Sequence, residues 1–217
     1  MLDIEGNYEK FKQYVSAYIT RDGDVSEFLN WLDSTDFKTA PASSKYNLSV
    51  PGGLCKHSLD VFFRLIKLIQ AENIEDYSKD TIALVSLLHD ISKVNRYKIY
   101  EKNVKNPDTG AWEKEMAYTV RPDDELLIYG TQEENSVYIL RHFFTMNQCE
   151  ENALLHINGA WDADDAKSKA ILSTSYRANK LAALLSMAEF MTVFIDENEK
   201  KGNIMNDYFF DIAEDGE

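Results

Sequence analysis

The chain has 217 residues, and its 44% hydrophobic content is enough for one sizeable buried core. Its 37 acidic and 23 basic residues give a formal charge of -14, which disfavours a broad surface for nucleic-acid phosphates. The longest apolar segments are shorter than the roughly 20 residues of a membrane span, so we expect a soluble protein. Cys55 and Cys149 form no CxxC pair, which favours a reduced, cytoplasmic setting. The length predicts one domain over residues 1–217.

The N-terminal quarter predicts two amphipathic helices followed by a loop. Residues 8–19 and 24–35 repeat apolar side chains at steps of three and four, as a helix with one buried face does. Ser26 is the expected N-cap of the second helix. Residues 39–53, TAPASSKYNLSVPGG, have the Pro, Ser and Gly density of an ordered loop that leads into the next helix.

Two strongly apolar helices should follow, over residues 54–70 and 80–94. The first carries His57 near its start, and the second carries His89 beside Asp90 at the end of its apolar run. Adjacent imidazole and carboxylate groups can bind one transition metal where the end of a helix splays them. The alternative is a core histidine hydrogen-bonded to a carbonyl oxygen, and spacing by itself does not separate the two.

A β-hairpin and further helices complete the pattern. Residues 97–120 alternate Tyr, Ile and Val on either side of NPDTG, which predicts two antiparallel strands. Helical periodicity then covers residues 133–146, 148–159 and 175–201, and an acidic tail with a small aromatic cluster occupies 198–217. The hairpin and the tail are candidate contacts of a homo-oligomer.

The segments GGLCKHSLDVF, LLHDISKV, LLHINGAWD and LSMAEFMTVFIDE, together with the hairpin, resemble the bacterial and phage branch of the HD-domain metal-dependent phosphohydrolases. The likeness covers roughly residues 28–197. It implies an all-α HD-domain bundle with a small β-hairpin insertion. In that family a first histidine, an adjacent His-Asp pair and a distant aspartate bind a divalent metal, and some members hold a second ion with further histidines.

The resemblance implies a metal site in this chain. By position, His57 matches the first histidine, and His89 and Asp90 match the pair. Glu189 stands where the family has its distant aspartate, and its side chain is one methylene longer. His156 matches an additional histidine of this branch, which would bind metal or contact the substrate.

Two histidine positions of the related branch hold other residues here. Asn47 stands at the first position, and Thr131 or Gln132 stands at the second. Because two candidate nitrogen ligands are replaced, the resemblance implies one divalent ion, of Mn, Fe, Zn, Ni or Mg, rather than two.

The implied reaction is hydrolysis of a phosphomonoester or phosphodiester, with a nucleotide as the first choice of substrate. Lys93 matches a lysine that faces the substrate phosphate, and Asp60 or His156 would assist proton transfer. Trp161 is a candidate to line the pocket mouth. The alternatives are a catalytically impaired HD-fold module that binds a nucleotide or a protein, and a purely structural helical protein.

Overall fold

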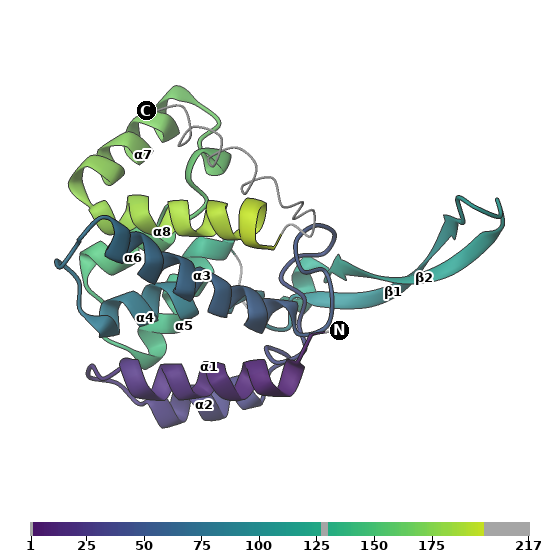
Figure 1. Ribbon diagram of the computed structural model, residues 1–217, viewed down its shortest axis with the longest axis horizontal. Helices are drawn as coiled ribbons and strands as arrows, with labels where there is room; N and C mark the ends of the chain where they lie inside the picture. The colour runs from purple at the N-terminus through teal and green to yellow at the C-terminus, as the bar shows by residue number, and fades with distance from the viewer. Residues whose placement is uncertain (1, 127–129, 198–217) are drawn as a thin grey trace, which may run out of the picture.

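Helices form most of the chain, and a single β-hairpin projects from them (Figure 1). The computed structural model describes residues 2–126 and 130–197. Within them, the α-helices are α1 (Ile4–Tyr18), α2 (Val25–Asp33), α3 (Gly53–Ala71), α4 (Lys79–Leu87), α5 (Gln132–Phe143), α6 (Gln148–Leu155), α7 (Ala166–Ala178) and α8 (Lys180–Met191). The expected mainly helical class with a two-stranded antiparallel sheet is confirmed.

Helix α3 lies at the centre of the bundle, where it contacts α1, α4 and α8 (Figure 1). Apolar side chains are buried on several sides of this helix, and Leu54, Leu59 and Leu65 are at most 2% exposed. Removing each such side chain from water contributes roughly 1.5–3 kcal/mol. The helix that carries His57 is therefore held on several sides by the core.

The expected loop over residues 39–53 lies against the start of α3. A Cβ at Gly53 would meet the Leu48 carbonyl oxygen at 2.1 Å and the Ala42 nitrogen at 2.9 Å, so only glycine allows this close approach. Gly52 precedes it with a left-handed φ of 78°. The loop therefore reaches the part of α3 near His57.

The N-terminus of α2 is capped by Asp24, whose side chain accepts a hydrogen bond from the backbone N–H of Glu27 at 2.8 Å. The expected cap at Ser26 is wrong, because Ser26 already lies inside the first helical turn. A carboxylate at this position also interacts favourably with the positive end of the helix dipole.

The expected continuous helix over residues 80–94 is interrupted. Helix α4 ends at Leu87, a 3-10 turn covers Ile91–Lys93, and Asn95 has a left-handed φ of 53°. The Ser86 carbonyl, which lies at the end of α4, accepts a hydrogen bond from the ring of His89. His89 and the residue after it therefore lie in a turn between two helical elements.

The expected long helix over residues 175–201 is also broken. The chain bends by 111° between α7 and the helical segment Lys180–Asp196 that contains α8. Asn179 caps α8, and its amide donates to the Cys149 carbonyl at 2.8 Å and to Asn152 Oδ1 at 3.0 Å. These contacts with α6 fix the bend, so local periodicity could not predict it. Helix α8 continues into a π-helical turn over Thr192–Asp196.

The hairpin has the bounds that its sequence predicts, with β1 over Tyr97–Lys105 paired antiparallel to β2 over Trp112–Val120. In the turn, the side chain of Asn106 accepts hydrogen bonds from two backbone N–H groups that follow it. The hairpin extends away from the helices (Figure 1), and Trp112 at its far end is 71% exposed.

No single helix within residues 2–126 and 130–197 combines the length and apolarity needed to cross a bilayer. One bent pair, Ala166–Ala178 with Lys180–Asp196, meets that requirement by length and composition only. The expected acidic tail over 198–217 lies outside the described residues.

Candidate metal centre

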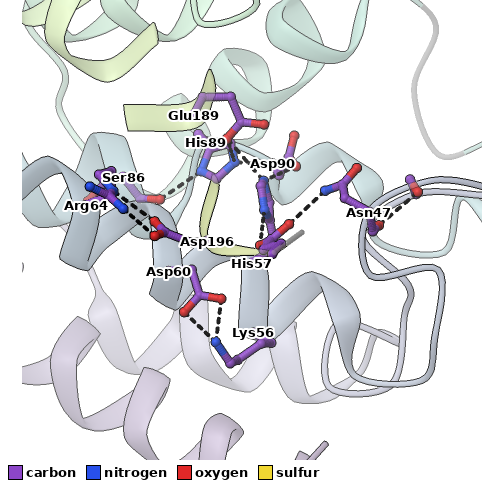
Figure 2. Close-up of polar contacts among 12 residues, drawn as sticks. Asn47, Lys56, His57, Asp60, Arg64, Ser86, His89, Asp90, Glu189 and Asp196 are labelled. Carbon is purple, nitrogen blue, oxygen red and sulfur yellow. Dashed lines mark hydrogen bonds and ion pairs between the residues drawn. The ribbon is translucent and has the colours of Figure 1, made fainter. Parts of the chain in front are cut away.

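Side chains from three parts of the chain converge on one buried point (Figure 2). His57 comes from α3, His89 and Asp90 follow α4, and Glu189 lies near the end of α8. His57 Nε2 lies 3.1 Å from Glu189 Oε2 and 3.6 Å from Asp90 Oδ2. His89 Nε2 lies 3.5 Å and 3.4 Å from the same two oxygens. We refer to these four side chains as the four-residue group.

The break after α4 allows two adjacent side chains to face the same point. In a continuous α-helix, neighbouring side chains point about 100° apart. Here His89 and Asp90 lie in the turn beyond Leu87, and Asp90 Oδ2 is 3.4 Å from His89 Nε2. The helix end therefore splays the pair in the way that metal binding by both residues requires.

Both imidazole rings present Nε2 to this point. His89 Nδ1 lies 2.7 Å from the Ser86 carbonyl oxygen, and His57 Nδ1 lies 2.8 Å from Glu197 Oε1. Because a carbonyl or carboxylate oxygen only accepts, Nδ1 carries the proton in each ring. In the neutral form of each ring the lone pair is therefore on Nε2, the atom that a metal ion would bind.

Three inward atoms of the four-residue group are buried without a hydrogen bond to any described residue: His57 Nε2, His89 Nε2 and Glu189 Oε2. Such unsatisfied atoms typically cost about 1–3 kcal/mol each. A cation would satisfy all three, and ligand atoms of His57, His89 and Asp90 lie within 4.8 Å of one another. The buried His57/His89/Asp90 group could therefore hold a metal ion, and its nitrogen and oxygen donors suit first-row transition metals.

The carboxylates of the group are held in their charged form. Burial by itself raises the pKa of Asp90, but Lys93 and the two histidines lower it more, so the net pKa lies well below the usual range. Burial also raises the pKa of Glu189, but the nearby histidines lower it more, so the net pKa lies below its usual value. For His57, burial lowers the pKa, whereas Glu189 and Glu197 raise it well above its usual value.

Lys93 contacts the group through Asp90, with Nζ donating to Oδ2 at 2.5 Å. The two side chains are only 15% and 13% exposed. Burial lowers the pKa of Lys93, but the Asp90 carboxylate raises it more, so the amine is an ammonium at neutral pH. The predicted phosphate-facing lysine thus lies beside the group and carries a positive charge.

The structure does not bring Asp60 or His156 into the group. Both carboxylate oxygens of Asp60 accept hydrogen bonds from Lys56, and burial raises the pKa of Asp60. His156 follows α6 and lines a separate cavity of about 590 Å³ with Asn152 and Lys167. Within residues 2–126 and 130–197, no contact joins His156 to the four-residue group.

The positions where the related branch has histidines serve other contacts. Asn47 donates from Nδ2 to Glu197 Oε2 at 3.0 Å, and Thr131 caps α5 by accepting from the Glu134 N–H at 3.2 Å. Sequence reasoning missed Glu197, because it lies within an acidic run and its partner His57 is 140 residues away in the chain.

A cavity of about 720 Å³ adjoins Glu189 at the end of α8. Trp161, Phe190 and Phe194 line it, and the rings of Trp161 and Phe194 are stacked with centroids 6.3 Å apart. Its volume and apolar lining are typical of small-molecule sites. Trp161 therefore lines a pocket beside the four-residue group, as its position in the sequence led us to expect.

Comparisons of the chain with family models, with curated proteins and with solved structures find no match. The assignment to the HD-domain phosphohydrolases therefore rests on the sequence segments and stays a prediction.

Proposed function

We propose that the chain is a metal-dependent phosphohydrolase of the HD-domain type that cleaves a phosphomonoester or phosphodiester bond in a nucleotide. The observation that carries the proposal is the convergence of His57 Nε2, His89 Nε2 and Glu189 Oε2, all buried and without a hydrogen bond to a described residue. Ordinary core histidines satisfy their buried nitrogens with hydrogen bonds. These atoms instead face one another, as metal ligands do.

The side chains have distinct roles in this proposal. His57, His89, Asp90 and Glu189 would hold one divalent ion, which when bound polarises a phosphoryl oxygen and lowers the pKa of water. Lys93 uses one N–H to hold Asp90, and its two other N–H groups can donate to phosphoryl oxygens and stabilise their negative charge. The proposal gives His156 no role in metal binding, and the part of Asp60 or His156 in proton transfer stays a prediction.

A nucleotide fits the surroundings of the site. The cavity beside Glu189 offers the stacked rings of Trp161 and Phe194, on which a base can lie. The overall charge of -14 opposes a phosphorylated ligand, but a bound divalent cation and Lys93 would offset the negative charges of Asp90, Glu189 and Glu197 locally.

Elemental analysis of protein purified without chelators, followed by assays on a panel of nucleotides with Mn²⁺ or Fe²⁺, tests the proposal. We expect about one transition-metal ion per chain and release of phosphate or a nucleotide product. Metal without hydrolysis would favour the binding-module alternative, and absence of both would exclude a metal-dependent phosphohydrolase.

Trp161→Ala should raise the KM for the nucleotide and leave kcat nearly unchanged, because Trp161 is proposed to bind the base and not the reacting phosphate. The loss of one stacking contact of about 1–3 kcal/mol corresponds to a roughly 5- to 150-fold increase in KM. Trp112→Ala is a matched control, since Trp112 and Trp161 are 71% and 70% exposed but Trp112 lies on the hairpin. Equal KM values for the two variants would contradict the placement of the base.

A further inference from the structure

The carboxylate of Glu197 is held at both oxygens. Oε1 lies 2.8 Å from His57 Nδ1, and Oε2 accepts from Asn47 Nδ2 at 3.0 Å. Figure 2 shows the Asn47 side chain directed toward His57. The side chains of His57 and Glu197 are each 1% exposed, so water does not compete for this contact. The two hydrogen bonds fix the orientation of the carboxylate and, through it, the orientation of the His57 ring.

The end of α8 has the geometry needed to direct Glu197 toward α3. The π-helical turn ends where the Glu197 N–H donates to the Thr192 carbonyl at 2.9 Å. The preceding residue, Asp196, accepts from Arg64 Nε at 2.8 Å, so two consecutive side chains both contact α3. In a regular α-helix they would point about 100° apart. Single π-helical turns of this kind occur often at functional sites.

We propose that Glu197 is a positioning residue of the metal site and that Asn47 supports it. This inference rests on the proposed function, because its consequence is the presentation of His57 Nε2 to a metal ion. Glu197 holds a proton on Nδ1, so Nε2, which lies 3.1 Å from Glu189 Oε2, is the nitrogen of His57 left to bind a metal ion. Where the related branch has a histidine, this chain has Asn47, which holds Glu197 and through it the proposed metal ligand His57.

Metal titration of the full-length chain with Mn²⁺ and with Zn²⁺ tests the inference. Glu197→Ala should weaken binding about 10- to 100-fold, as is usual when the partner of a ligating histidine is removed. Glu197→Gln should have an intermediate affinity, because its amide oxygen can still accept from Nδ1. Glu151→Gln is the control: it weakens the pair of Glu151 with Arg141, outside the four-residue group, and should bind metal as the wild type does.

The tautomer of His57 in the metal-free protein provides a second readout, through long-range ¹H–¹⁵N correlations at a pH high enough for the ring to be neutral. At that pH the wild type should show the proton on Nδ1, and Glu197→Ala should show a larger share of rings with the proton on Nε2. Unchanged affinity and tautomer in folded Glu197→Ala protein would overturn the inference and leave the proposed function intact. If the wild type binds no metal, the proposed function fails, and the tautomer alone then decides whether Glu197 positions His57.

Discussion

Replacing His89 by alanine is expected to remove metal binding and hydrolysis together. His89 Nε2 is one of two nitrogens that face the oxygens of Asp90 and Glu189, at 3.4 Å and 3.5 Å. Without it, one imidazole and two carboxylates remain to hold the ion. The loss of affinity should exceed the roughly 10- to 100-fold typical of a partner outside the ligand set. Metal content and the rate of phosphate release measure the effect.

His142→Ala is the matched control for this experiment. His142 is exposed at the end of α5, where its ring contacts Phe143, and it lies outside the four-residue group. The control should keep both metal and activity. If His89→Ala keeps them as well and differs from the wild type only in stability, His89 is an ordinary core histidine.

Replacing Arg21 by alanine is expected to lower the free energy of unfolding by about 3–5 kcal/mol, because it leaves a buried carboxylate without its cation. The guanidinium donates to both oxygens of Glu150 at 2.7 Å, and Glu150 is fully buried. Arg21 also donates to Asp80 at 2.5 Å, and Thr81 donates to Glu150 at 2.8 Å. The network joins the segment after α1 to the starts of α4 and α6.

The same network should make the free energy of unfolding depend on pH in the acid range. Burial by itself raises the pKa of Glu150, but the hydrogen bonds from Arg21, Asn147 and Thr81 outweigh it, and the net pKa is lowered. A carboxyl group with a lowered folded-state pKa contributes stability above its unfolded value of about 4.3, and this stability is lost as the pH falls through the folded value. At pH 7 the Glu150→Gln variant should therefore have a lower free energy of unfolding than the wild type. Below about pH 4 it should lose less of that free energy than the wild type loses.

Urea unfolding at pH 7 and at acid pH measures both effects. Lys114→Ala is a suitable control, because the pair of Lys114 with Glu101 is 71% and 55% exposed and should contribute at most about 1 kcal/mol. An Arg21→Ala variant that stays within about 1 kcal/mol of the wild type would contradict the role of the network.

The members of the four-residue group could be identified from the sequence, whereas the geometry that unites them could not. His57, His89, Asp90 and Glu189 were singled out from apolar helical segments and from the family resemblance. The break after Leu87 was missed because apolar periodicity continues through ISKV, while the turn depends on a hydrogen bond from the ring of His89 to the end of α4.

Features that depend on distant contacts carried no local signal. Glu197 is one acidic residue among several in IDENEKK, and its partners lie 140 and 150 residues away in the chain. Asn179 interrupts a segment of strong helix formers because its side chain contacts α6. In contrast, the hairpin over residues 97–120 was predicted with its correct bounds, because strand alternation and turn residues are both local.

The central claim is that the four-residue group binds one divalent ion. Anomalous diffraction at the zinc edge from crystals grown with Zn²⁺ tests it most directly. We predict one peak, about 2.0–2.1 Å from the Nε2 atoms of His57 and His89, with carboxylate oxygens of Asp90 and Glu189 completing the site. Density at that point with no anomalous signal, or zinc bound only elsewhere on the chain, would contradict the claim.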